Sequence, residues 1–376
     1  MTRLRLAVLG GGANSAVGRA HLSSLNLSNG WTNAIGLFSR DKNINRESAL
    51  LWQIGHLVDT FEEFVEMSRE FADVFLVLTP TPDHFSQLRR LIPLGMPIIC
   101  EKSVTSSYSQ AQEVDKLVKK FNTKVLVTYN YTAYPMVREI REMVKRGDFG
   151  DIHTFQIDML QDGFLTVDNS GNRKNIQEWR AKDYEIPTVS LDLGVHCFNL
   201  LHFILDDSIK ELIGIQASHG NYKNVIDSVS SIIRTRSGAS GQIRFGKAFL
   251  GEKNRFTISI YGSSGAAKWN QEWPNEFLLS DKYGEVTIKT FASPNLIEAN
   301  KSRYMRFKAG HPFGFIEAFA NLYDDIHRHI NNHDSDFVFG VENALKDLRA
   351  LTALQTSAKS GSWVMLDNTK GMTVAE

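Results

Sequence analysis

The sequence is poor in three features that would mark a special class of protein. Its 376 residues include only two cysteines, Cys100 and Cys197, and both lie in apolar runs, so we expect buried thiols and a reducing compartment. No charge is in excess, because 42 Lys and Arg balance 42 Asp and Glu. This balance argues against a nucleic-acid or anionic-membrane partner. No apolar run is long enough to span a membrane. Residues 2–9 lead directly into a strand pattern, and we expect no signal peptide and a cytoplasmic location.

Short apolar strands alternate with amphipathic helices in the first third of the chain, which is typical of a parallel sheet covered by helices. The helix at 109–121 is expected to begin at Ser109, with Gln112 completing a capping box. We predict a doubly wound dinucleotide-binding α/β domain over 1–129. Its expected strands are 4–9, 34–38, 74–78, 97–100 and 124–128, and its expected helices are 62–71, 85–94 and 109–121.

After a further helix at 135–145 the pattern changes to consecutive strands with short turns. Phe256, Ile258 and Ile260 alternate with polar residues, as in a sheet that is buried on one face. We predict an α+β domain over 130–376 that binds substrate and forms oligomers, and its C-terminal helix could pack back on the first domain. The expected strands are 152–160, 211–219, 228–235, 240–245, 255–261 and 276–279, and the late helices are 315–330 and 342–359.

A glycine-rich segment, residues 10–21, follows the first strand and opens a helix. Glycines let the backbone turn tightly and approach a pyrophosphate, which then rests on amides at the positive end of the helix. The segment holds extra residues before Gly18 compared with the compact G-x-G-x-x-G form, and a simple strand-to-helix connection is the alternative interpretation. We expect a dinucleotide to contact Gly10, Gly12, Ser15, Ala16 and Val17.

The end of the second strand indicates which dinucleotide binds. An enzyme specific for NAD places a carboxylate there to hold the ribose hydroxyls. Here the residues are Ser39 and Arg40, and a hydroxyl and a guanidinium suit a 2′-phosphate. The sequence therefore favours NADP(H) over NAD(H), while Asp41 keeps NAD(H) open.

Two later strands end in polar residues at the same expected sheet edge, where ligands of such folds bind. Thr79, Pro80 and His84 follow one strand, and Glu101 and Lys102 follow the next. We assign these residues to the dinucleotide site. A lysine there can also stabilise a developing alkoxide, whereas in isolation a Glu-Lys pair is usually a surface ion pair.

Asp192 and His196 form a second candidate cluster. If the segment is helical, the two residues lie on one face, four positions apart. Hydride transfer at a carbinol carbon requires a proton transfer at its oxygen, and a histidine oriented by a carboxylate is the usual agent. The alternative interpretation is a polar pair that only stabilises the helix.

Taken in order, these motifs resemble the glucose–fructose oxidoreductase, inositol dehydrogenase and rhizopine-catabolism family (Gfo/Idh/MocA) almost from end to end. The resemblance also includes Asn130-Tyr131, Trp179-Arg180 and a segment at 310–319. It implies a Rossmann domain plus an α+β domain with a large open, predominantly antiparallel sheet, through which homodimers or homotetramers form. The substrates that it implies are sugars, sugar derivatives and cyclitols.

The resemblance also assigns roles to residues. Lys102, Asp192 and His196 match the family's catalytic set. Asn130, Tyr131, Trp179 and Arg180 match substrate-facing positions, together with Asp192 and His196. Three positions depart from the family pattern: Ser103 replaces a proline, Thr132 an arginine and Phe313 a glutamate.

We therefore expect an NAD(P)-dependent dehydrogenase or reductase that acts on CH–OH groups. Two alternatives remain open. One is an NAD-dependent glycosidase that works through a transient keto intermediate, and the other is a non-catalytic sensor of dinucleotide or sugar. The chemistry needs no metal, and the cluster of His327, His329 and His333 has the pattern of a solvated helix end rather than a ligand set.

Overall fold

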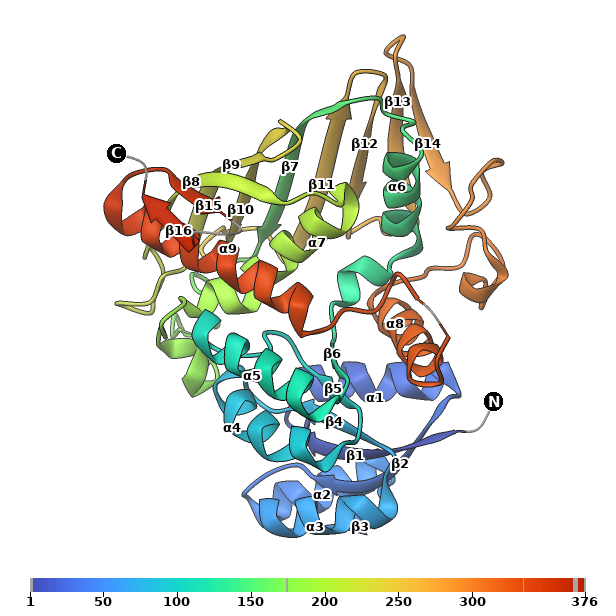
Figure 1. Cartoon of the computed structure of the whole chain (residues 1–376), viewed down its shortest axis with the longest axis vertical. Helices are drawn as coiled ribbons and strands as arrows, with labels where there is room; N and C mark the ends of the chain where they lie inside the picture. Colours follow the sequence, from blue (N-terminus) through green and yellow to red (C-terminus); the bar gives the residue numbers. More distant parts are fainter. Residues whose placement is uncertain (1–2, 174, 334, 368–370, 375–376) are drawn as a thin grey trace. The chain divides into compact units, whose positions relative to one another are not determined.

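The computed structural model describes residues 3–173, 175–333, 335–367 and 371–374. The chain divides into two compact units (Figure 1). The first unit comprises Met1–Ala133 and Phe315–Leu345, and the second comprises Tyr134–Gly314 and Lys346–Glu376. These units differ from the expected ranges 1–129 and 130–376 chiefly in that 315–345 belongs with the first.

The first unit is built on a parallel sheet with the strand order β3-β2-β1-β4-β5-β6. Its central strands are buried on both faces, which explains their continuous apolar runs. This order, together with helices on both faces, is that of a Rossmann fold, as expected. The strands are β1 (Leu4–Gly10), β2 (Trp31–Leu37), β3 (His56–Leu57), β4 (Val74–Leu78), β5 (Ile98–Cys100) and β6 (Val125–Val127).

Helices connect these strands along the chain. One later helix, α8, belongs to the same unit. The cap of α5 differs from the expectation, because Ser107 rather than Ser109 accepts the hydrogen bond from the backbone of Gln110. The late helix α8 packs on α1, where Ser28 donates to Asp324 over 2.6 Å. The helices are α1 (Ala16–Ser28), α2 (Lys42–Trp52), α3 (Phe61–Phe71), α4 (Thr81–Leu91), η1 (Ile92–Leu94), α5 (Tyr108–Phe121), η2 (Asn130–Ala133) and α8 (Phe315–Ile330).

The second unit is built on a ten-stranded sheet with the order β14-β13-β12-β11-β7-β10-β9-β8-β15-β16. Among the described strands of this sheet, only the β7–β10 pair is parallel, so the expected predominantly antiparallel sheet is confirmed. The strands are β7 (Ile152–Leu160), β8 (Ile209–Ala217), β9 (Ser228–Thr235), β10 (Ser240–Gly246), β11 (Arg255–Gly262), β12 (Gly265–Asn270), β13 (Glu276–Asp281), β14 (Val286–Thr290), β15 (Val364–Asp367) and β16 (Gly371–Val374).

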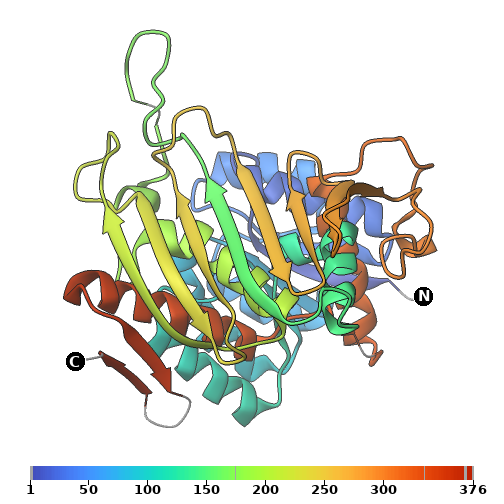
Figure 2. The same cartoon turned by 90° about the horizontal axis from the view of Figure 1, so that it is seen from above.

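One face of this sheet carries the helices and the other is open (Figure 2). Along β11 the side chains of Phe256, Ile258 and Ile260 are buried, while the residues between them are only partly buried. The helical elements are α6 (Pro135–Lys145), η3 (Glu178–Ala181), η4 (Ser190–Gly194), α7 (Val195–Leu205), η5 (Ser302–Tyr304) and α9 (Val341–Ser360). Among the described residues, no helix has the length and apolar character needed to cross a membrane.

Candidate active site

The glycine loop between β1 and α1 follows a path that favours glycine. Gly10 and Gly11 have φ values of 81° and 72°, in the left-handed region. A Cβ atom on Gly10 would lie 2.7 Å from the backbone nitrogen of Thr79. One on Gly18 would lie 2.1 Å from the carbonyl oxygen of Gly11. The loop therefore packs against the end of β4 and the first turn of α1, despite the extra residues before Gly18.

The helix that follows this loop begins at Ala16. Ser15 caps it by accepting a hydrogen bond from the backbone of Gly18 over 3.1 Å. The amides of Ala16 and Val17 have no carbonyl partner within the helix, as is general for a first turn. Such amides at the positive end of a helix are suited to an anionic phosphate.

Two residues of α2 form hydrogen bonds with the backbone of the glycine loop, and sequence reasoning missed both. Ser48 accepts a hydrogen bond from the backbone of Ala13 over 2.8 Å, and Trp52 Nε1 donates to the carbonyl of Gly11 over 3.0 Å. A Cβ atom on Gly12 would lie 2.9 Å from Ser48 Oγ. These contacts fix the loop before any ligand arrives.

The residues after β2 differ in their contacts and in their exposure to solvent. Asp41 caps α2, since its carboxylate accepts hydrogen bonds from the backbones of Asn43 and Ile44 over 2.8 and 3.2 Å. Ser39 is partly buried and Arg40 is exposed. The carboxylate is therefore engaged within its own helix, while the arginine side chain faces solvent.

His84 connects the loops after β4 and β5. The ring is fully buried, with Nδ1 2.8 Å from the carbonyl oxygen of Ser103 and Nε2 2.8 Å from that of Thr79. Burial lowers the pKa of His84, and hydrogen bonding to the two carbonyls offsets only part of this effect. His84 thus connects Thr79 with Ser103 through hydrogen bonds. Pro80 follows Thr79 in the chain and directly precedes α4. The peptide bond between Lys102 and Ser103 is cis.

Glu101 points into the interior of the first unit. Its Oε1 lies 3.0 Å from Nε2 of His21 and accepts a second hydrogen bond from Thr128. Burial would raise the pKa of Glu101, but these hydrogen bonds and the charges of His21 and Lys102 outweigh it and lower the pKa to about 2. Lys102, the next residue, is partly buried. His21 and Thr128 were not among the expected site residues, although His21 ends the glycine-rich segment.

Asn130 and Tyr131 lie in the short helix η2 that follows β6. Both are buried, with 2% and 5% of their surface exposed. The ring of Tyr131 lies 6.3 Å from that of Phe315 at the start of α8. The fold therefore places both residues after a strand end of the first unit.

In the second unit, Asp192 lies between two cations. Arg180 donates to Asp192 Oδ2, and Lys247 Nζ lies 2.5 Å from the same oxygen. Asp192 and Lys247 are buried, with 6% exposure each. The structure thus brings Arg180, Asp192 and Lys247 together. Sequence reasoning missed Lys247, because its contact with Asp192 depends on tertiary packing.

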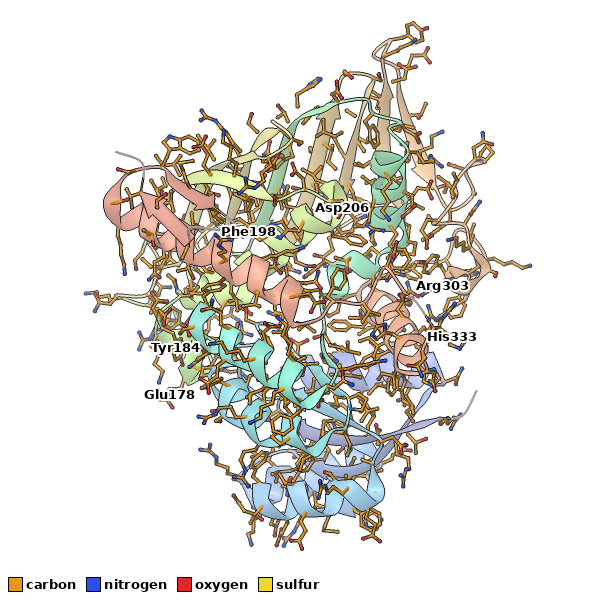
Figure 3. The ribbon with its side chains drawn as sticks, in the orientation of Figure 1. Glu178, Tyr184, Phe198, Asp206, Arg303 and His333 are labelled. Carbon is orange, nitrogen blue, oxygen red and sulfur yellow. The ribbon has the colours of Figure 1, made fainter. Side chains whose placement is uncertain are left out.

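Trp179 and Arg180 occupy η3 and support one another. The guanidinium carbon of Arg180 lies 4.6 Å from the centre of the Trp179 ring, and both side chains donate to Gln177 Oε1. Figure 3 labels Glu178 of η3 and Tyr184, which follows this helix in the chain. The stacking orients the guanidinium that reaches Asp192.

The segment that carries Asp192 and His196 is not one continuous α-helix. Residues Ser190–Gly194 form a π-helical turn, and α7 begins at Val195. Gly194 permits this turn to approach the core, because a Cβ atom there would lie 2.7 Å from the ring of Phe245. His196 is buried in the first turn of α7, two residues before Phe198 (Figure 3). Single π turns inside helices are frequent at functional sites.

A metal centre finds no support in the part of the chain that the structure describes. No group of three or more histidine, cysteine, aspartate or glutamate side chains there could hold an ion. His327 packs edge-on against Trp31 with ring centres 5.4 Å apart, and its carbonyl accepts from Asn331. Both thiols, Cys100 and Cys197, are reduced and buried.

Comparisons with known proteins agree with this architecture. A family model described as an oxidoreductase family with an NAD-binding Rossmann fold matches residues 4–129, and the Gfo/Idh/MocA C-terminal domain model matches 137–268. The uncharacterised oxidoreductase YfiI of Bacillus subtilis is 26% identical over 85% of this chain and 84% of its own length. Levoglucosan dehydrogenase of Pseudarthrobacter phenanthrenivorans is 23% identical over 58% of this chain and 62% of its own length.

Among solved structures, an inositol dehydrogenase homologue from Azotobacter vinelandii in complex with NAD⁺ is similar in fold. Its TM-score is 0.88, with 22% identity over 97% of this chain and 98% of that one. The fold and the two family models define an oxidoreductase with a dinucleotide-binding Rossmann domain. The chain belongs to the Gfo/Idh/MocA family.

Proposed function

We propose that this oxidoreductase transfers a hydride between a nicotinamide dinucleotide and a secondary alcohol or ketone of a sugar, sugar derivative or cyclitol. Relatives support this substrate class. The Azotobacter inositol dehydrogenase homologue was also solved with NADH and myo-inositol, and levoglucosan dehydrogenase with NADH and L-sorbose. One observation carries the proposal: the glycine loop abuts the end of β4, and Lys102 follows the neighbouring strand β5 at the same edge of the sheet.

The first unit has the features that a dinucleotide requires. Gly10 and Gly18 leave room where a Cβ atom would collide with backbone, so the loop can approach a pyrophosphate closely. The amides of Ala16 and Val17 and the residues Gly12, Ser15, Thr79 and Pro80 would line it. When bound, the dinucleotide supplies or accepts the hydride.

For the choice of dinucleotide we propose NADP(H). The side chain of Arg40 is exposed and next to Ser39, which suits a 2′-phosphate. Asp41 is the only carboxylate in this short segment, and it is engaged in capping α2. It is therefore held away from the role of a ribose ligand.

The chemical step is assigned to three side chains. His196 takes the proton of the substrate hydroxyl during oxidation and returns it during reduction. Lys102 stabilises the negative charge that develops on the substrate oxygen. Asp192, held by Arg180 and Lys247, orients the hydrogen bonds around the substrate.

We assign substrate binding to four further residues, in line with the family resemblance. Asn130 and Tyr131 present a side-chain amide and a phenol after β6, and Trp179 and Arg180 provide an aromatic face and a guanidinium. These groups suit a polyhydroxylated ring, which offers hydroxyls to polar groups and C–H faces to aromatic rings.

We also propose that the open face of the ten-stranded sheet joins copies of the chain as a homodimer or homotetramer. Three isoleucines gather there on paired strands: Ile215 is 71% exposed, Ile232 is 47% exposed and Ile213 lies opposite Ile232. Exposed apolar patches of this kind commonly mark interfaces. Light scattering of the native chain and of Ile215→Lys tests this, because the charge should dissociate the oligomer, whereas a monomeric native chain would exclude it.

The function is tested by following the absorbance of NADPH or NADH with a panel of ketosugars and inososes, and of NADP⁺ or NAD⁺ with the matching alcohols. Lys102→Ala should abolish turnover while dinucleotide binding stays nearly intact, and His196→Ala should lower turnover by roughly 100-fold or more. Turnover of Lys102→Ala at the native rate would overturn the assignment. Sugar release without net change in the dinucleotide would favour a glycosidase instead.

A further inference from the structure

A buried series of hydrogen bonds leads from α8 to the residue before Lys102. The hydroxyl of Tyr323 lies 2.6 Å from Nδ1 of His21, and Nε2 of His21 lies 3.0 Å from Oε1 of Glu101. The exposed fractions of Tyr323, His21 and Glu101 are 0%, 0% and 6%. Three separate stretches of the first unit are therefore linked by hydrogen bonds in series, ending at the carboxylate of Glu101.

The phenol of Tyr323 is protonated in this series of hydrogen bonds. Burial, together with the negative charge of Glu101, raises the pKa of Tyr323 well above its ordinary value, so the phenol keeps its proton. The phenol hydroxyl therefore bonds to Nδ1 of His21, while the other ring nitrogen, Nε2, faces the carboxylate of Glu101. Thr128 donates to the same carboxylate oxygen. Two donors thus converge on Oε1.

This arrangement holds a negative charge inside the protein, where an uncompensated carboxylate would be costly. The pKa of about 2 for Glu101 means that the carboxylate is ionised at every pH at which the enzyme would work. The charge of Lys102 is one of the groups that stabilise it. The attraction is mutual, so the carboxylate also restrains the ammonium.

We propose that His21 and Tyr323 are positioning residues for Lys102. They hold Glu101 in place as an anion, and Glu101 in turn fixes the ammonium of Lys102 at the end of β5, where it stabilises charge on the substrate oxygen. The inference rests on the proposed function, in which Lys102 touches the reacting oxygen. The backbone there is already fixed, because the amide of Glu101 donates to the carbonyl of Val77 over 2.9 Å. The hydrogen bonds of His21 and Tyr323 therefore position the side chain of Lys102 and not its backbone.

Two substitutions at His21 separate positioning from packing. His21→Leu fills the space but removes the donor, and we expect kcat to fall by roughly 10- to 100-fold, the range of a hydrogen bond to a charged group. His21→Gln keeps a donor, and kcat should recover to within about threefold of the native value. In both variants the KM for substrate and the Kd for the dinucleotide should stay within about threefold of native, because the His21 side chain is fully buried.

A pH profile gives a signature that loss of packing does not produce. In His21→Leu the carboxyl loses its main donor, so burial raises the pKa of Glu101 and the carboxylate becomes protonated at mildly acidic pH. We expect kcat of the reduction to fall on the acid side in this variant. The native enzyme should show no such fall, because its Glu101 stays ionised there.

Further variants supply the controls. Ser28→Ala breaks another contact between α1 and α8, the hydrogen bond to Asp324, and should leave kcat unchanged. Tyr323→Phe removes one oxygen and should lower kcat by roughly 3- to 10-fold. If circular dichroism shows that His21→Leu does not fold, Tyr323→Phe serves as the test variant instead.

The outcomes distinguish this inference from the proposed function. Native kcat and a native pH profile in His21→Leu and Tyr323→Phe, with an inactive Lys102→Ala, overturn the positioning role alone. A fully active Lys102→Ala overturns the proposed function. An equal loss of kcat in Ser28→Ala and His21→Leu assigns the effect to helix packing and also overturns the inference.

Discussion

The ammonium of Lys247 lies 2.5 Å from Oδ2 of Asp192, although the two residues are 55 positions apart in the chain. Lys247→Met should remove one cation from a buried carboxylate that Arg180 also contacts. We expect the free energy of unfolding to fall by roughly 1–3 kcal/mol, the cost of an unsatisfied buried polar group, and kcat/KM to fall by roughly tenfold or more.

Denaturant unfolding and steady-state kinetics check this expectation. Lys253→Met is the matched control, because Lys253 also contacts an aspartate over 2.8 Å, but its side chain is 77% exposed. An exposed pair contributes little, so the control should change both quantities only slightly. Equal effects of the two substitutions would show that the contact with Asp192 has no special importance.

Gly18→Ala tests the glycine loop. The added methyl group would lie 2.1 Å from the carbonyl oxygen of Gly11, and because that atom belongs to the backbone the loop must move. We expect the Kd for the dinucleotide to rise by roughly tenfold or more, measured by calorimetry. Gly163→Ala adds the same group where nothing lies within 4 Å, and it should bind as the native chain does.

The choice of dinucleotide depends on Arg40. Arg40→Ala should raise the KM for NADPH by roughly tenfold or more and change the KM for NADH little, because only NADPH carries the 2′-phosphate. Asp41→Ala should instead lower the stability of the fold by about 0.5–2 kcal/mol through loss of the helix cap, without changing the preference. The assignment would be contradicted if the native enzyme used NADH better than NADPH and Arg40→Ala showed the same preference.

Glu101 should make stability depend on acid pH. Its pKa in the folded chain, about 2, lies below the ordinary value of 4.5. Ionised Glu101 therefore contributes stability above pH 4.5, on the order of 3 kcal/mol, and this contribution is lost as the pH falls toward 2. The difference in unfolding free energy between the native chain and Glu101→Gln should shrink on acidification. A difference that is constant with pH would show that the carboxylate is not ionised in the fold.

The two cysteines should be inert in the native state. Burial raises the pKa of the Cys100 and Cys197 thiols well above the ordinary value, so almost no thiolate forms and reagents have no access. A thiol-specific dye should label neither residue until denaturant is added, and then both. Rapid labelling of the folded chain would place at least one thiol at the surface.

Long, regular elements could be predicted from the sequence because their periodicity is strong. The strands Val74–Leu78 and Ile152–Leu160 and the helix Phe315–Ile330 have the expected bounds. The helix Lys42–Trp52 was missed because its exposed Leu50 and Leu51 and its polar buried Asn45 blur the apolar stripe. The π turn at Ser190–Gly194 was also missed, since nothing in residue spacing separates it from an α-helix.

The candidate site was predictable where motif residues end strands, and not where distant elements meet. Glu101 and Lys102 could be found because they follow a buried strand. Lys247 and Tyr323 could not, because their contacts with Asp192 and His21 depend on tertiary packing over 55 and 302 positions. Asp192 was expected to share one helical face with His196, whereas the structure connects it to Arg180 and Lys247.

Hydride transfer itself is measured most directly with a reduced dinucleotide deuterated at C4 of the nicotinamide ring. The native enzyme is incubated with a ketosugar or inosose that supports turnover, and the product is analysed by mass spectrometry. The account predicts one deuterium on the carbon that gains the hydroxyl, and none with Lys102→Ala. Product without deuterium from either stereospecifically labelled form of the dinucleotide would contradict it.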